Sequence, residues 1–186
     1  MAIVIDTCSL VMIAKNYLPL DKDGQLHSFL EGAFASKELM LLDVILEESR
    51  RISKGIAVEK MPFLRDKKLV SKTEDLLPPA PEKFSNMVDN NFCVRLMKQQ
   101  LTEEQYIGQK EEYLKTGDAK IIIYVLKVLH SDAIHLEEIQ VMTEETRQQN
   151  DGKLFKKLPL LCEQIGVETI TVSEYLHRNG FFIDKA

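Results

Sequence analysis

Four short runs of apolar residues recur along the chain, and each is nearly continuous rather than alternating with polar positions. Continuous runs of this kind are typical of parallel strands whose two faces are both covered by helices. They predict strands at residues 2–6, 38–43, 139–143 and 168–172. The sequence therefore predicts a mostly parallel central sheet of four or five short strands.

Between the strands, apolar residues return at the three- and four-residue spacing of amphipathic helices. Thr102 and Gln105 fit a capping box at the start of one helix, and Gly166 is placed to end another. The order of the elements predicts an α/β protein with three layers, in which helices cover both faces of the sheet. The predicted helices lie at residues 26–36, 44–53, 84–100, 102–114, 118–129, 159–165 and 173–178.

The middle of the chain, from residue 55 to about residue 116, shows no strand pattern. The run Pro78-Pro79-Ala80-Pro81 interrupts it, because proline lacks an amide donor and restricts the residue before it. We expect one domain over residues 1–186, with a helical insertion at about 55–115.

Composition adds that the chain is an ordinary globular protein, since 45% of its residues are hydrophobic and 28% are charged. No apolar run approaches the roughly 18 residues of a membrane helix, and the early charge of Asp6 is unlike a signal peptide. Three cysteines and four histidines lack metal-ligand spacing, and the cysteines are interpreted as reduced thiols. These features predict a cytoplasmic protein without a membrane partner.

The net charge of −5 argues against a protein that coats nucleic acid through bulk electrostatics. Between Arg50 and Lys72, however, eight basic residues stand against two acidic ones. This local excess either follows phosphates or is a solvated surface. If it contacts RNA, the candidates are Arg50, Arg51 and Lys54.

Acidic residues stand where predicted strands end and where the next helices begin. The carboxyl ends of parallel strands meet along one edge of a sheet, so these acids are expected to converge there. In chain order they are Asp6, Glu47 or Glu48, Asp118, and Glu144 or Glu145.

Most of these acids also have a structural explanation when taken alone. Asp118 could cap a helix, and Glu47 and Glu48 could complement a helix dipole. Asp6 is harder to explain, because a charge at the end of a buried strand is costly unless it is paired, caps a helix or binds a cation. Clustered carboxylates raise one another's pKa unless a cation neutralises them, and Mg²⁺ or Mn²⁺ suits such oxygen ligands. An acidic cluster alone fits a nuclease or a phosphatase.

The order of these motifs resembles the PIN-domain family of metal-dependent ribonucleases. The run Ile3-Val4-Ile5-Asp6-Thr7-Cys8-Ser9 is similar to the strand that opens the family, and Val44-Ile45-Leu46-Glu47-Glu48-Ser49 is similar to its second acidic motif. The third motif resembles Gly117-Asp118-Ala119. The fourth is Thr143-Glu144-Glu145, where glutamate replaces the usual aspartate.

The resemblance implies a three-layer α/β/α fold in which four carboxylates bind one or two Mg²⁺ or Mn²⁺ ions. A metal-bound water would then hydrolyse an RNA phosphodiester, leaving a 3′-hydroxyl and a 5′-phosphate. Thr7 or Ser9 could assist through a hydroxyl group, or either could instead cap the helix after the first strand. The implied ligands are Asp6, Glu48, Asp118 and Glu145, with Glu47 and Glu144 as alternatives one position away.

The expected function is therefore a metal-dependent endoribonuclease with RNA as substrate. Many small members of the family are toxins of toxin–antitoxin pairs and are often dimeric, so an antitoxin partner and a homodimer are further expectations. The alternative is a catalytically weak or inactive PIN-like binding or scaffolding module, which Glu145 in place of aspartate motivates. A phosphohydrolase with Asp6 as nucleophile is disfavoured because no second Asp follows two residues later, and a Rossmann nucleotide binder because no glycine-rich turn follows the first strand.

Overall fold

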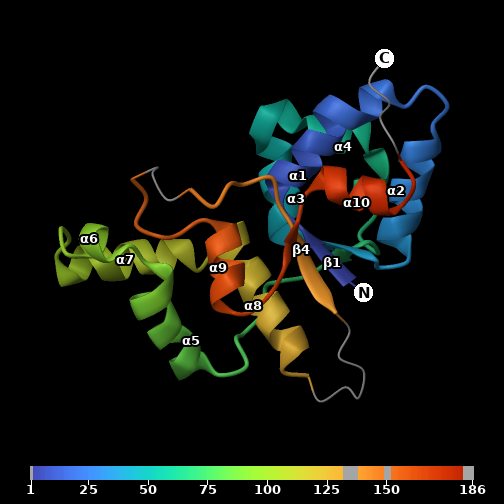
Figure 1. Cartoon of the computed structure of the whole chain (residues 1–186). Coiled ribbons are helices and arrows are strands. Elements are labelled where there is room, and N and C mark those ends of the chain that lie inside the picture. Colours follow the sequence, from blue (N-terminus) through green and yellow to red (C-terminus); the bar gives the residue numbers. More distant parts are fainter. Residues whose placement is uncertain (1, 132–137, 149–151, 182–186) are drawn as a thin grey trace.

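The computed structural model describes residues 2–131, 138–148 and 152–181 (Figure 1). Its five strands form one all-parallel sheet in the order β3-β2-β1-β4-β5. The predicted parallel sheet is confirmed, as are the four predicted strands. The strands are β1 (Ala2–Ile5), β2 (Leu39–Leu42), β3 (Val70–Ser71), β4 (Ile139–Met142) and β5 (Thr169–Ile170).

The central strands are buried because helices cover both faces of the sheet. Val4 in β1 pairs with Met40 in β2 on one side and with Val141 in β4 on the other, and all three side chains are buried. From β1 the chain runs to β2 on one side of β1, and it later returns to form β4 on the other side of β1. The strand order thus reverses between β1 and β4, which is where open α/β sheets have a crevice at their carboxyl edge.

The helices form two layers, one on each face of the sheet (Figure 1). Helices α1, α2, α3, α4 and α10 lie on one side, and α8 and α9 lie on the other. Together with the sheet they make the three-layer α/β/α arrangement expected from the sequence. These helices are α1 (Thr7–Met12), α2 (Gln25–Ala35), α3 (Asp43–Arg51), α4 (Ile56–Lys60), α8 (Gly117–Leu129), α9 (Leu158–Gln164) and α10 (Val172–Arg178).

Short helical turns complete the layer that contains α1, α2, α3, α4 and α10. A π-helical turn (Ile13–Tyr17) and a 3₁₀ turn (Leu18–Leu20) continue α1, and two further 3₁₀ turns (Ile52–Gly55 and Pro62–Arg65) flank α4. Gly166 ends the stretch after α9 with a φ of +72°, as its position in the sequence predicts.

The prediction that residues 55–116 contain no strand is wrong at β3. This strand has only two residues, Val70 and Ser71, and pairs with the end of β2. Its position is fixed just beyond the strand, where Thr73 donates hydrogen bonds from its amide (3.1 Å) and its hydroxyl (2.6 Å) to the Asp43 carboxylate. Asp43 therefore holds the edge of the sheet in place.

The helical insertion contains α5 (Pro81–Met87), a π-helical turn (Val88–Phe92), α6 (Arg95–Lys98) and α7 (Glu103–Tyr113). The capping box of Thr102 and Gln105 is present at the start of α7. The single helix predicted over residues 84–100 is wrong, because the chain becomes extended at Cys93 and forms an isolated antiparallel bridge with Phe155. A partner 62 residues later in the chain overrides the local helical pattern.

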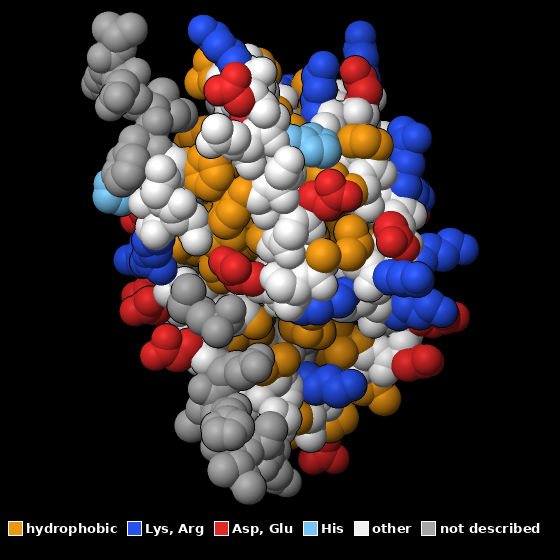
Figure 2. All heavy atoms as spheres, turned by 90° about the vertical axis from the view of Figure 1, so that its right-hand side faces the viewer, with side chains coloured by type: hydrophobic (Ala, Val, Ile, Leu, Met, Phe, Trp, Pro, Cys, Tyr) orange, Lys and Arg blue, Asp and Glu red, His pale blue; other side chains and the backbone are white. Residues whose placement is uncertain are grey.

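Helix α10 packs against α2, in the same helical layer (Figure 1). Phe29 of α2 lies against Tyr175, with ring centroids 5.8 Å apart, and the Tyr175 hydroxyl donates a 2.9 Å hydrogen bond to Glu38 at the start of β2. Figure 2 shows this side of the molecule, where patches of hydrophobic side chains lie among charged ones.

The described helices include none that is both long and apolar enough to cross a membrane.

Candidate active site

Asp6 lies at the carboxyl end of β1, where α1 begins. Its carboxylate caps α1 by accepting the Thr7 amide at 2.6 Å. The second oxygen accepts the Cys8 thiol at 2.8 Å and the Thr143 hydroxyl at 3.2 Å. Only 6% of the surface of Asp6 is exposed, and hydrogen bonds from its own helix and from the end of β4 compensate its charge in part.

Glu48 reaches the same place from the middle of α3. One carboxylate oxygen accepts the Gly117 amide at 2.9 Å, and the other accepts the Thr7 hydroxyl at 2.9 Å. A Cβ at position 117 would lie 2.8 Å from a Glu48 oxygen and 2.6 Å from Cδ1 of Ile45. Any larger residue at position 117 would therefore displace the ends of these two side chains, and the observed position of the Glu48 carboxylate depends on glycine.

Asp118 lies in the first turn of α8 and does not cap it. Thr116 is the capping residue, since its side chain accepts the Ala119 amide. The alternative interpretation of Asp118 as a helix cap is thus not what the structure has. Its carboxylate is left to face the other acids.

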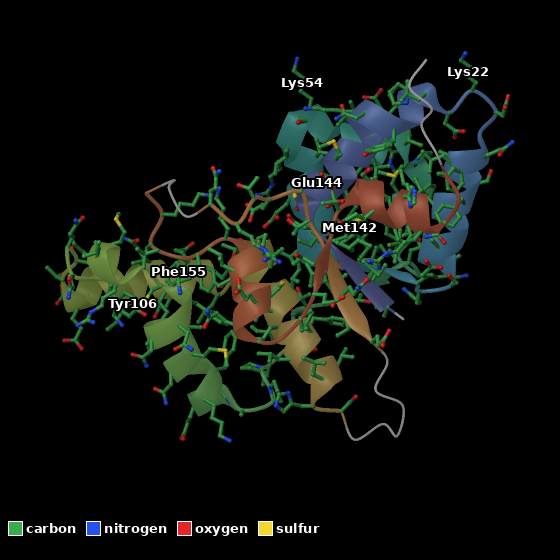
Figure 3. All side chains as sticks on the ribbon, in the orientation of Figure 1. Lys22, Lys54, Tyr106, Met142, Glu144 and Phe155 are labelled. Atoms are coloured by element: carbon green, nitrogen blue, oxygen red, sulfur yellow. The ribbon has the colours of Figure 1, made fainter. Side chains whose placement is uncertain are left out.

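Glu145 follows β4 and accepts the Leu158 amide at 3.1 Å, at the first residue of α9. Its neighbour Glu144 points elsewhere and accepts the Val172 amide at 2.7 Å, at the start of α10. Figure 3 labels Glu144 just beyond the end of β4. Of these two glutamates, Glu145 is the one that lies near the other acids.

The four acids line one cavity of about 650 Å³ at the carboxyl edge of the sheet. Asp6 and Glu145 come from the ends of β1 and β4, on either side of the point where the strand order reverses. Glu48 and Asp118 come from helices on opposite faces of the sheet. We call this space the acidic cavity, and its four acids at the sheet edge are Asp6, Glu48, Asp118 and Glu145. A fifth acid, Glu112 of α7, also lines the cavity and pairs with Lys115.

Burial and mutual repulsion change how these carboxyl groups ionise. The pKa of Asp118 is raised from 3.8 to about 8, chiefly by burial and then by the charges of Asp6, Glu145 and Glu48. The pKa of Asp6 is also raised, with burial as the largest cause and the charge of Glu145 adding to it. Without a cation, Asp118 is therefore mostly protonated at neutral pH.

The Cys8 thiol supports the same arrangement. Burial and the charge of Asp6 raise the pKa of Cys8 to about 12, so the thiol stays protonated. A protonated thiol can donate to Asp6, whereas a thiolate would repel it. Cys8 is accordingly a hydrogen-bond donor to the acid rather than a nucleophile.

The oxygen donors of the acidic cavity fit a hard divalent cation such as Mg²⁺ or Mn²⁺, which prefers carboxylates. A cation would also remove the repulsion that raises the pKa of Asp118. Within residues 2–131, 138–148 and 152–181, no three His, Cys, Asp or Glu side chains already stand in ligand geometry. Three of the acids, Asp6, Glu48 and Glu145, are instead held by backbone amides.

Several residues proposed from the sequence lie outside the residues that line this cavity. Glu47 is exposed and pairs with Arg50. Ser9 is fully buried in the core, and its hydroxyl has no hydrogen-bond partner among the described residues. Arg51 is exposed beyond Glu48 on α3, and Figure 3 shows Lys54 pointing outward from the protein. Thr7, in contrast, lines the cavity.

Sequence reasoning missed other residues that line the cavity. Tyr113, at the end of α7, is buried there with a hydroxyl that has no described hydrogen-bond partner. Burial, followed by the charge of Asp118, raises its pKa. Residues 153–157 also line the cavity, and the basic pattern of Lys153, Lys156 and Lys157 close after the fourth acidic motif was the signal that could have indicated them.

Comparisons of the chain with family models, with curated proteins and with solved structures found no match. The class that the structure itself defines is an all-parallel, three-layer α/β/α protein with an acidic cavity at the carboxyl edge of its sheet.

Replacing Asp118 with Asn should stabilise the metal-free protein at pH 8. Wild-type Asp118 holds its proton in the folded chain up to about pH 8 but loses it near pH 4 when unfolded. The free energy of unfolding contributed by this group therefore falls as pH rises from about 4 to about 8. At about 1.4 kcal/mol for each pKa unit, Asp118→Asn should remove that fall and raise the free energy of unfolding at pH 8 by several kcal/mol, as measured by urea unfolding in EDTA.

The matched control is Glu111→Gln, an exposed acid on α7, which should leave the pH profile of unfolding as in the wild type. Equal profiles for Asp118→Asn and the wild type would contradict the repulsion described above.

Adding a methyl group at residue 117 should destabilise the protein. Gly117→Ala pushes a Cβ into Ile45 and Glu48, and overpacking of this kind costs about 1–3 kcal/mol. Gly108→Ala is the control, because that glycine lies in α7 with nothing within 4 Å of the place its Cβ would take. It should be neutral or stabilising by up to about 1 kcal/mol. Thermal unfolding of the two variants measures the difference, and equal stability would show that α3 and α8 are not in close contact at Glu48.

Proposed function

We propose that this protein is a metal-dependent endoribonuclease of the PIN-like kind, which hydrolyses RNA phosphodiester bonds. The observation that carries the proposal is the convergence of four carboxylates from four separate chain segments on one cavity. Structural uses such as helix capping account for single acids, but they do not explain why all four meet. A cation that the four share does explain it.

Three of the four proposed ligands have a group that orients them. Asp6 is held by the Thr7 amide and by the Thr143 hydroxyl. The other oriented ligands are Glu48, through Gly117, and Glu145, through the Leu158 amide. Mg²⁺ or Mn²⁺ bound by such oxygens can activate a water molecule and stabilise the attacking and leaving oxygens of a phosphodiester.

Thr7 is the residue proposed to assist. Its hydroxyl lines the cavity and donates to Glu48, so it can position that carboxylate and, when the cavity is filled, a phosphate oxygen. Ser9 drops out of this role because it is fully buried in the core.

The cellular setting is part of the same proposal. The cysteines Cys8, Cys93 and Cys162 are free thiols, which suits the reducing cytoplasm. A toxin of a toxin–antitoxin pair, with an antitoxin protein or a second copy of the chain as partner, is the setting that the resemblance to PIN-domain proteins suggests.

A second candidate is a PIN-like binding or scaffolding module with weak or absent catalysis. Two observations favour it: Glu145 stands where aspartate is usual, and its carboxylate already accepts the Leu158 amide. In this alternative, the glutamates serve as links between elements rather than as metal ligands.

Changing Asp6 to Asn should abolish cleavage of RNA without unfolding the protein. The amide removes one charged ligand while keeping the size of the side chain, and the loss should be at least about 100-fold. Cleavage of a labelled RNA in Mg²⁺ or Mn²⁺ is the assay, with circular dichroism to verify folding. Asp118→Asn should behave in the same way.

The matched control is Asp75→Asn, an exposed aspartate that does not line the cavity, which should cleave as the wild type does. Undiminished cleavage by folded Asp6→Asn would rule out the proposed site. Products other than a 3′-hydroxyl and a 5′-phosphate would contradict the proposed hydrolysis.

Thermal unfolding in Mn²⁺ should separate the two candidates. A ligand bound only by the folded state stabilises it by about 2.7 kcal/mol at roughly 100 times its Kd, or about 5–10 °C in Tm for a chain of this size. The enzyme hypothesis predicts such a rise for the wild type and none for Asp6→Asn. A Tm that Mn²⁺ leaves unchanged in both proteins would favour the scaffolding module.

A further inference from the structure

Residues 153–157 border the acidic cavity on the side of the helical insertion. All five of them line the cavity, and three of the five are lysines. Lys153 is exposed, while Lys156 and Lys157 are partly buried. This short segment therefore brings positive charge to a cavity whose other charges come mainly from the four acids at the sheet edge.

Backbone pairing fixes the segment in place. Leu154 accepts the Val94 amide at 2.7 Å through its carbonyl, and the Lys156 amide donates to the Phe92 carbonyl at 2.9 Å. These bonds flank the antiparallel bridge between Phe155 and Cys93, the extended residue that follows the π-helical turn after α5. Figure 3 labels Phe155 beside the helical insertion. The segment is thus a built wall of the cavity rather than an unsupported loop.

The wall also carries an aromatic surface. Phe155 stacks on Tyr113 with ring centroids 4.0 Å apart and an angle of 15° between the planes. Phe155 is only partly buried and lines the cavity. Proteins that bind single-stranded nucleic acid combine basic grooves that follow the backbone with aromatic side chains that stack on bases. Both parts are present within these five residues.

We propose that residues 153–157 form the phosphate-binding wall of the acidic cavity and that the cavity accepts a single-stranded nucleic acid. The backbone of the strand lies along Lys153, Lys156 and Lys157, and one base stacks on Phe155. A single strand fits this wall because its unpaired bases are free to stack, whereas the bases of a duplex are already stacked and paired. The inference rests on the proposed function, since that function brings nucleic acid to this cavity.

The lysines have one other use, which is to act as counter-charges for the acids. Lys153 does act to lower the pKa of Asp118. Counter-charges alone would not make binding of a free strand depend on the wall, and neither would they involve Phe155. Binding measurements on variants of the wall therefore distinguish the two uses.

The test is fluorescence anisotropy with a labelled single-stranded RNA roughly 12 nucleotides long, in EDTA so that metal-dependent cleavage does not proceed. Lys153→Gln, Lys156→Gln and Lys157→Gln combined should raise the Kd at least about tenfold and reduce the slope of log Kd against log salt by about 2. Phe155→Leu, which keeps an apolar side chain against Tyr113, should raise the Kd about fivefold.

The matched control combines Lys67→Gln, Lys68→Gln and Lys72→Gln. It removes the same charge from exposed positions that do not line the cavity, and it should bind nearly as the wild type does. A duplex of the same sequence should bind at least about tenfold more weakly than the single strand.

Three results would overturn the inference: unchanged binding by the wall variants, an equal loss in the control variant, or a duplex that binds as tightly as the single strand. These outcomes are separable from the proposed function. If the wall variants bind and cleave as the wild type does, only the inference fails. If RNA is never cleaved with Mg²⁺ or Mn²⁺ but binding depends on the wall, the inference stands and the enzyme hypothesis fails.

Discussion

Asp6, Glu48, Asp118 and Glu145 repel one another across a single cavity, and the residues around them act to hold them there. The repulsion is visible in Asp118, whose pKa rises to about 8 through burial and through its three acidic neighbours. Hydrogen bonds from backbone amides, from the hydroxyl groups of Thr7 and Thr143 and from the protonated thiol of Cys8 compensate the other charges in part. We propose that a bound cation compensates the repulsion that these donors leave, because a divalent cation neutralises clustered carboxylates.

Sheet topology supplies the convergence that the acids need. Because the strand order reverses between β1 and β4, the ends of these two strands border one crevice. Helices α3 and α8 approach that crevice from opposite faces and touch at Gly117, where glycine leaves room for Glu48. Residues more than a hundred positions apart in the chain thereby become neighbours. Residues 153–157 line the same cavity on the side of the helical insertion.

The sequence could predict the parts of this fold that depend on local pattern. Continuous apolar runs located β1, β2, β4 and β5, and the capping box at Thr102 located the start of α7. Strand β3 could not be found in this way, because Val70 and Ser71 lie between lysines rather than in a continuous apolar run. The position of β3 depends on the hydrogen bonds between Thr73 and Asp43. The break at Cys93 was equally invisible, since it is imposed by the distant partner Phe155.

For the site, the acidic motifs indicated which segments meet, while only the structure separates neighbouring acids. Glu47 and Glu48 differ by about 100° around α3, so one faces solvent and the other faces Gly117. The wall at residues 153–157 was not predicted, because three lysines in five residues form no motif. They become candidates only through their position beside the cavity. The most direct measurement is diffraction from a crystal soaked in Mn²⁺. We predict anomalous density among Asp6, Glu48, Asp118 and Glu145, and a cavity without such density at saturating Mn²⁺ would contradict the account.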